Sequence, residues 1–188
     1  MAYSFIDRFW SQYPMERSVS IYGGDGVNTT PLSDLNILIA SCVEDLKSDL
    51  YVVEYVNCPS QITPVSEDVF AVVNARLSAF AFAGNTSVPI QLDRGLHQLR
   101  CLYIPARATV RRYLRVSDID TLVGAQLQFF TAYVMYKAAM KELTVLQSVT
   151  LEADNGTVNL QPLADFAERN RALWEQMRED ILIYTGGF

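Results

Sequence analysis

The sequence predicts an α+β protein: a mixed, β-rich middle with an N-terminal helix and a C-terminal hairpin of long helices joined by a small β-hairpin. Two observations predict this class. Apolar residues recur with a helical period at about 31–49, 117–146 and 162–184. Between the first and second of these helices, short β-branched and aromatic runs end at Pro, Gly or Asn, which is typical of strands.

The length of 188 residues suits about one domain. A chain of this size buries roughly 70% of its unfolded surface, so it needs no metal or disulfide to hold a core. We therefore expect a single domain over residues 1–188, divided into an N-terminal arm (1–30), an α/β middle (31–116) and a helical hairpin (117–188).

The N-terminal part contains two expected helices. Residues 2–13 would form a short amphipathic helix, and a strand with a glycine-rich turn would follow at about 18–26. Residues 31–49 form the more regular helix, because Thr30 is a suitable N-cap and Pro31 suits the first helical position. Its apolar stripe consists of Leu35, Leu38, Ile39, Cys42, Val43 and Leu46.

Strands are expected at residues 51–56, 87–91 and 99–104. The segment 68–83 is ambiguous, because it begins and ends like a helix. Its apolar residues nevertheless alternate with polar ones around Asn74, which is a strand period. We favour a strand, since the residues that follow are β-like.

The C-terminal third is expected to be a helical hairpin. A helix capped by Ser117 would run to about residue 146, and because it is apolar on two sides it would be buried between layers or between subunits. A small β-hairpin with strands at 150–153 and 157–160 would turn at Asn155 and the glycine that follows it. The last helix, 162–184, would then pair antiparallel with the first.

The residues that usually build catalytic or metal sites are scarce. His97 is the sole histidine, and Cys42, Cys58 and Cys101 are far apart with no CxxC pair. Zinc sites and His-based nucleophiles need several such groups at suitable spacing. The glycine run at 23–26 lacks the Lys-Ser/Thr ending of a phosphate loop. We expect no metal, no cofactor, no enzymatic activity and reduced cysteines; an enzyme with a carboxylate site stays open as an alternative.

Targeting signals are not expected either. The first residues lack the basic start and apolar stretch of a signal peptide, and no run of 18 apolar residues occurs without a charge. We therefore expect neither secretion nor a membrane span.

The charge is distributed unevenly along the chain. The net charge is −6, yet residues 69–117 contain seven arginines and one aspartate, which gives +6 and leaves −12 for the rest. Arginine makes bidentate contacts to carboxylates and phosphates better than lysine does. The interaction residues that we select from this segment are Arg100, Arg107, Arg111, Arg112 and Arg115.

This basic segment allows three interpretations. It would bind the acidic ends of a neighbouring copy, it would bind nucleic acid with interleaved Tyr103 and Tyr113, or it would be a solvated loop. We favour the first, because a positive patch and a negative patch on one chain match head to tail, and such contacts close into rings. Four N-terminal aromatic residues, Phe5, Phe9, Trp10 and Tyr13, would either add exposed surface for assembly or form a large aromatic core.

Three stretches of the C-terminal half resemble the small neck, or head-to-tail connector, proteins of tailed bacteriophages. They are the run 103–110 leading into 115–120, the aromatic helix 127–146, and the Ala-Asp-Asn-Gly turn at 153–156 followed by a last helix ending at 180–184. The similarity is one of pattern over roughly half of the chain.

The resemblance implies a structural virion protein and not an enzyme. Such proteins form homo-oligomeric rings between the portal of the capsid and the tail, and DNA passes through the channel without specific binding. It implies portal- or tail-side partners, no membrane, assembly in the host cytoplasm and a final place in the phage neck. A nucleic-acid-binding protein that uses the cluster at 107–115 is the alternative from another class.

Overall fold

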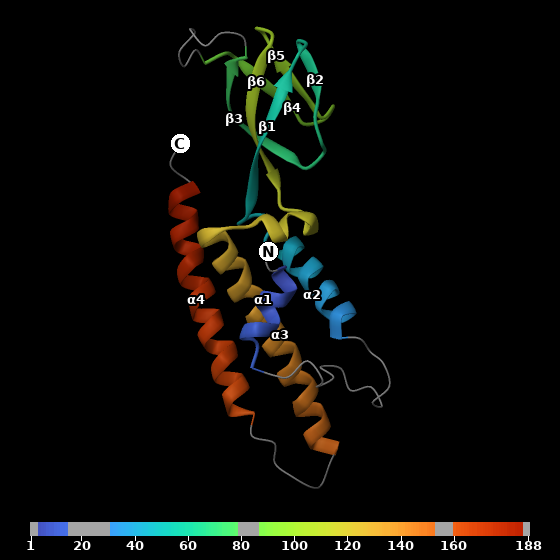
Figure 1. Cartoon of the computed structure of the whole chain (residues 1–188), viewed down its shortest axis with the longest axis vertical. Coiled ribbons are helices and arrows are strands. Elements are labelled where there is room, and N and C mark those ends of the chain that lie inside the picture. Colours follow the sequence, from blue (N-terminus) through green and yellow to red (C-terminus); the bar gives the residue numbers. More distant parts are fainter. Residues whose placement is uncertain (1–3, 15–30, 79–86, 153–159, 186–188) are drawn as a thin grey trace. The chain divides into compact units, whose positions relative to one another are not determined.

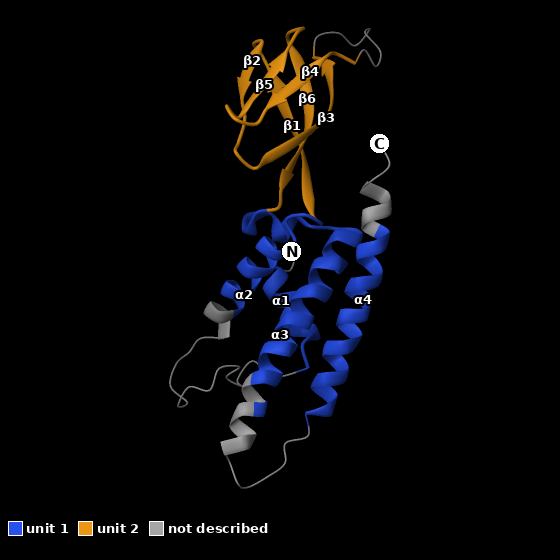
Figure 2. Cartoon of the chain, turned by 180° about the vertical axis from the view of Figure 1, so that it is seen from behind, with its two compact units in different colours: residues 1–49, 115–188 blue, residues 50–114 orange. Residues whose placement is uncertain are grey.

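The computed structural model describes residues 4–14, 31–78, 87–152 and 160–185 (Figure 1). It is about 50% helical and 27% strand, which confirms the α+β class. The chain forms two compact units (Figure 2). Residues 1–49 and 115–188 make the helical unit, and residues 50–114 make the β unit. The sequence grouped 31–49 with the β-rich middle, whereas in the structure these residues belong to the helical unit; the expectation of one domain stays a prediction.

The helical unit has two long helices that lie side by side and antiparallel in both views (Figures 1 and 2). These are the two helices that the sequence predicted to pair. Its elements are α1 (Phe5–Gln12), α2 (Pro31–Asp45), the 3-10 helix η1 (Val116–Thr121), α3 (Gly124–Glu152) and α4 (Gln161–Thr185).

The short helix α1 is held by its aromatic residues. The Ser4 side chain caps the helix by accepting a hydrogen bond from the Asp7 N–H. Its three aromatic residues and its C-cap Tyr13 are buried. Two of the four reach other helices: the ring centroids of Phe5 and Phe130 are 5.2 Å apart, and those of Tyr13 and Phe166 are 5.7 Å apart. Of the two interpretations of these aromatics, the structure supports the aromatic core.

One carboxyl group lies inside this core. Glu142 of α3 is 1% exposed, and one of its oxygens accepts a hydrogen bond from the Tyr13 hydroxyl at 2.5 Å. Its other oxygen, Oε1, has no hydrogen-bond partner among the described residues. Burial raises the pKa of Glu142 above its ordinary value, and the hydrogen bond from Tyr13 only partly opposes this.

Glu142 should therefore make the stability of the helical unit depend on pH. Because its pKa is higher in the folded state than in the unfolded state, the stabilisation is complete in acid and is lost as the pH rises through the folded-state pKa. Replacing Glu142 with Gln keeps an acceptor for Tyr13 and removes the titration. In urea unfolding, the variant should gain stability over the wild type on going from pH 4 to pH 8. The exposed Glu179→Gln is the control, and an equal gain for both variants would contradict the assignment.

Two ion pairs join α2 and its C-terminal turn to the long helices. The carboxylate of Asp45 accepts a hydrogen bond from the Tyr133 hydroxyl at 2.9 Å and pairs with Lys137 at 3.1 Å. Burial, followed by the hydrogen bond to Asp45, raises the pKa of Tyr133 to about 12. Asp49, buried after α2, pairs with Arg178 of α4 at 3.0 Å. Five residues of the stripe predicted for the 31–49 helix are buried, as expected: Leu35, Ile39, Cys42, Val43 and Leu46.

The start and end of α3 differ from the prediction. Ser117 does not cap a long helix but lies in η1, and α3 begins only at Gly124, whose φ of +57° suits glycine. At its other end α3 continues to Glu152, so the predicted strand is wrong at 150–152. Extending an existing helix adds one hydrogen bond per residue, and this outweighs the weak strand preference of a few residues. The remainder of the predicted β-hairpin lies outside the described residues, as do the predicted strand and turn at 18–26.

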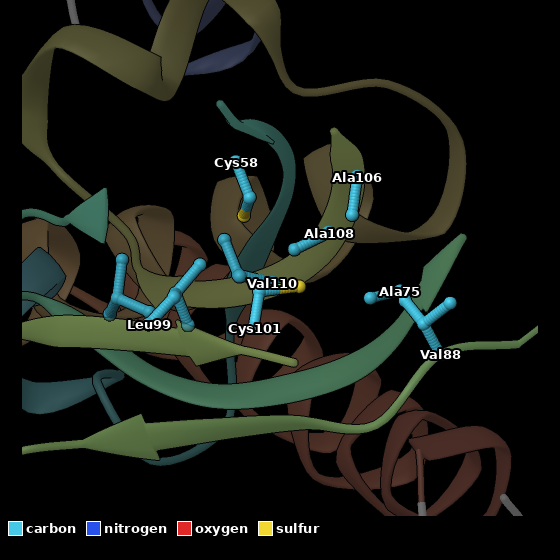
Figure 3. Packing of buried hydrophobic residues seen from close by; sticks show 9 residues of the cluster. Cys58, Ala75, Val88, Leu99, Cys101, Ala106, Ala108 and Val110 are labelled. Carbon is cyan, nitrogen blue, oxygen red and sulfur yellow. The ribbon is translucent and has the colours of Figure 1, made fainter. Parts of the chain in front are cut away.

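The β unit consists of two three-stranded antiparallel sheets, with strand orders β1-β6-β3 and β2-β5-β4. The strands are β1 (Tyr51–Cys58), β2 (Ile62–Pro64), β3 (Val69–Leu77), β4 (Ile90–Asp93), β5 (Gln98–Cys101) and β6 (Ala106–Tyr113). Figure 3 shows the buried cluster between them, to which both sheets contribute. Its members are small or medium in size: Cys58, Val69, Ala75, Val88, Leu99, Cys101, Ala106, Ala108 and Val110.

The ambiguous segment 68–83 is a strand, β3, over Val69–Leu77, as favoured, and its residues 79–83 lie outside the described residues. Its alternation is interrupted, because the pairing with β6 shifts register between Val69 and Ala71 and again between Val72 and Asn74. Such bulges turn one side chain away from its expected side, and Val73 is accordingly 43% exposed. Two other expected strands are shorter than predicted: 87–91 is a strand only from Ile90, and 99–104 only as far as Cys101.

Candidate interaction surface

The sheet β1-β6-β3 has one side in the core and one side outside it. Along β6, Ala106, Ala108 and Val110 are buried, and the residues between them point to the other side. Directly opposed residues of antiparallel strands share a side, so the pairing register extends this side over all three strands. We call it the arginine–tyrosine face, and its residues are Tyr51, Val53, Tyr55 and Asn57 of β1, Arg107, Thr109, Arg111 and Tyr113 of β6, and Ala71, Asn74 and Arg76 of β3.

Two arginines of this face stack on tyrosines of the neighbouring strand. The guanidinium carbon of Arg107 lies 4.2 Å from the ring centroid of Tyr55, and that of Arg111 lies 4.7 Å from the ring centroid of Tyr51. A cation–π contact of this kind contributes about 0.5–1 kcal/mol at exposed sites. Its main effect here is to limit the freedom of the two guanidinium groups. Arg107 is exposed, whereas Arg111 is half-buried and its Nε is buried without a hydrogen-bond partner among the described residues.

The face carries positive charge without a balancing acid. Arg76 is directly opposite Arg107 in the register. In the described part of the chain, neither of them nor Arg111 forms an ion pair with a carboxylate. Like charges directly opposed across strands are destabilising, so a bound anion would relieve this repulsion.

A hollow of about 750 Å³ lies at the Arg76 end of the face. Besides Arg76 and Arg107, its polar lining includes Asn57, Asn74 and Thr109. Amide, hydroxyl and guanidinium donors together are suited to carboxylate or phosphate oxygens. The arrangement is that of a binding surface for anionic groups.

The five arginines selected from the sequence fall into different places. Arg107 and Arg111 lie on the arginine–tyrosine face. Arg100, on β5 of the other sheet, pairs with Asp93 at 3.0 Å. Arg112 is buried on the core side of β6, where its Nε lies 2.6 Å from Glu54. Arg115 belongs to the helical unit, where its backbone N–H donates to the Asp118 carboxylate at 2.8 Å.

Arg76 also lies on the face, but it is not among the five arginines predicted from the sequence to be interaction residues. It lies in the same basic segment, but in the sequence it stands 31 positions before Arg107. The signal that would have found it is the cross-strand register, since the pairing of β3 with β6 brings the two arginines together.

The two units differ in charge. The β unit has six arginines and four acidic residues, which gives +2. The helical unit has the other nine bases and 17 acids, which gives −8. The basic surface therefore belongs to a chain whose larger part is strongly acidic.

The described residues do not gather into a metal site. Across residues 4–14, 31–78, 87–152 and 160–185, no three His, Cys, Asp or Glu side chains gather as a metal site would require. His97 lies in the turn between β4 and β5, with a φ of +48°. None of the helices, as far as they are described, has the length and apolar character needed to cross a membrane.

No protein-family model matches the chain, and no curated protein is significantly similar to it.

Proposed function

We propose that this chain is a structural subunit of a homo-oligomeric ring, of the kind that connects the portal and capsid of a tailed phage to its tail around the DNA channel. The observation that carries the proposal is the arginine–tyrosine face: three arginines on an open sheet, without carboxylate partners in the described chain, in a protein whose helical unit is −8. The pattern resemblance of the C-terminal half to phage neck proteins supports the same function.

The charge distribution favours a head-to-tail contact. A basic patch and an acidic patch on the same chain are complementary to each other and not to themselves, so each copy offers one of each. Contacts of this type close into rings when the rotation between copies allows it. The proposal includes portal- or tail-side partners, a place in the virion neck, and a predominantly acidic chain along which DNA passes without being held.

The native mass of the purified protein tests ring formation. We expect discrete rings at low salt, visible by negative-stain microscopy, that dissociate as salt screens the contact. The variant Arg107→Glu/Arg111→Glu should remain monomeric and folded, with a loss of about 1–2 kcal/mol of stability from the two cation–π contacts. The control Arg94→Glu/Arg100→Glu makes the same change in net charge within the β unit but away from the face, and should still form rings. A wild-type chain that is monomeric at every salt and protein concentration would contradict the proposal.

A second candidate uses the same face. Tyrosines paired with arginines on an open sheet are also an arrangement on which single-stranded bases stack while the arginines contact phosphates. If the protein has this function, it binds an oligo-dT probe, the affinity falls steeply with salt, and Arg107→Glu/Arg111→Glu abolishes binding. Absence of binding at low salt would exclude this candidate.

A further inference from the structure

Helix α4 carries a stripe of acids on the side away from its packing partners. At 100° per residue, Asp165, Glu168, Glu175 and Glu179 fall within about 80° of the helix circumference. All four are exposed, whereas the residues that α4 buries, Leu163 and Ala167, lie on the far side. We call these four residues the acidic stripe.

The stripe keeps a net negative charge. Arg171, at one edge, pairs with Glu175 at 2.9 Å and lies 3.9 Å from Glu168. Asp165 accepts a hydrogen bond from the uncharged Gln161, and no ion pair to Glu179 is formed within the described residues. Arg169 lies at the other edge, about 40° beyond Asp165, so four acids and two arginines leave −2 along this side of the helix.

The spacing of the stripe fits the spacing of the arginines. Arg107 and Arg111 are four residues apart on β6, or about 13 Å at strand geometry. On α4, Glu168 and Glu175 are separated by about 10 Å, and Glu168 and Glu179 by about 16 Å. A helix laid along β6 would thus place a carboxylate near each end of the basic row, within reach of the flexible arginine side chains.

Apolar surface accompanies the charges of the face, since Val53 and Tyr55 are 50% and 61% exposed. A helix packed on an open sheet is a common way to bury such surface.

We propose that the arginine–tyrosine face of one copy binds the acidic stripe of α4 of a second copy. This inference rests on the proposed function, because it names the contact that would link the subunits of the ring. Each copy carries one face and one stripe, so the contact is heterologous and repeats from copy to copy. The acceptors supplied by the stripe would satisfy Arg76, Arg107 and Arg111 together.

Charge reversal on both sides tests the contact. The sheet variant Arg107→Glu/Arg111→Glu and the helix variant Glu168→Lys/Glu179→Lys should each raise the concentration of half-assembly at least about 100-fold. The chain carrying all four changes should form rings again. An equimolar mixture of the two variants should also associate, because each variant's stripe then matches the other variant's face. The copies must alternate, so the mixture closes into rings if the subunit number is even and forms open chains if it is odd, and either product counts as restoration.

Two neighbouring residues provide a matched control on α4. Glu179 and Asp180 are both exposed acids, but they lie about 100° apart around the helix. Glu179→Lys should weaken assembly and Asp180→Lys should not.

The outcomes separate this inference from the proposed function. If the wild type forms no rings, the proposed function fails. If the wild type and the helix variant both form rings while the sheet variant does not, the ring stands and α4 is not the occupant. Restoration in the four-change chain without restoration in the mixture would place the contact within one copy and overturn the inference.

Discussion

Replacing Phe9 with alanine is expected to lower the free energy of unfolding by about 3–5 kcal/mol, the cost of deleting a buried phenylalanine. Phe9 is fully buried, stacks on Tyr13 at 4.9 Å and meets Trp10 edge to face at 5.1 Å. A helix as short as α1 does not persist without packing, so the loss should extend to the whole segment. Because small proteins are stable by only about 5–15 kcal/mol, the change should be evident in urea unfolding.

The exposed Gln12 of the same helix provides the control. Gln12→Ala should leave the unfolding midpoint nearly unchanged. In Phe9→Ala, the fluorescence of Trp10, which is 8% exposed in the wild type, should shift to the red as α1 detaches. A loss below about 1 kcal/mol would mean that Phe9 is not part of the core, since a buried phenylalanine costs more than this to remove.

Replacing Arg112 with glutamate is expected to lower the free energy of unfolding by about 2–3 kcal/mol, because it places a carboxylate without a hydrogen-bond partner at a buried position. Arg112 is 7% exposed, and its Nε lies 2.6 Å from the carboxylate of Glu54. The new carboxylate would be buried and would face Glu54, whose half-exposed side chain lets solvent screen part of the repulsion. Loss of strand signal in circular dichroism and a lower thermal midpoint would report the effect.

The adjacent Arg111 is the matched control, because successive strand residues point to opposite sides. Arg111→Glu makes the same change in charge on the other side of the strand, where it removes the cation–π contact with Tyr51, and it should cost only about 0.5–1 kcal/mol. Equal destabilisation by the two substitutions would contradict the assigned orientations. Changes intended to block assembly therefore belong at Arg107 and Arg111, since a change at Arg112 would confuse folding with binding.

The helices were the predictable part of this fold, because their signals are local and repeated. The stripe from Leu35 to Leu46 and the seam from Leu163 to Met177 each span several turns, so that one misleading residue does not hide the period. The predicted start of the helix at 117–146 was wrong, because two neighbouring helical elements compete for the same residues. Ser117 has the sequence of a helix cap, yet the chain forms η1 first and restarts at Gly124.

The positions of β1, β3, β4 and β5 were predicted approximately, but β2 and β6 were not predicted, and neither was the pairing of any strand. Strand β2 has only three residues and includes Pro64, which is too little for a periodic signal. The bulges of β3 turn Val73 outward, and no local sequence pattern predicts these bulges.

The basic charge of the candidate surface was predictable from the sequence, but the arginines that form it were not. A basic segment is visible in the sequence, but which arginines share a side depends on registers set by residues far apart. Alternation along β6 separates Arg111 from Arg112, and the pairing with β3 adds Arg76. Assigning the face therefore required knowing both that β6 is a strand and which strands flank it.

In the amino-acid sequence, the residues of the β unit interrupt those of the helical unit, and this has a consequence for the order of folding. Residues 50–114 are contiguous in the chain, whereas α2 and α3 are not, although they pack together. Bringing the ends of such a long loop together costs on the order of 4 kcal/mol in chain entropy. The ladder of β1 and β6 already does this, since Tyr51 is paired with Tyr113. Once the sheet has formed, the two ends of the loop lie a few ångströms apart, so that α2 and α3 meet as near neighbours in the chain would.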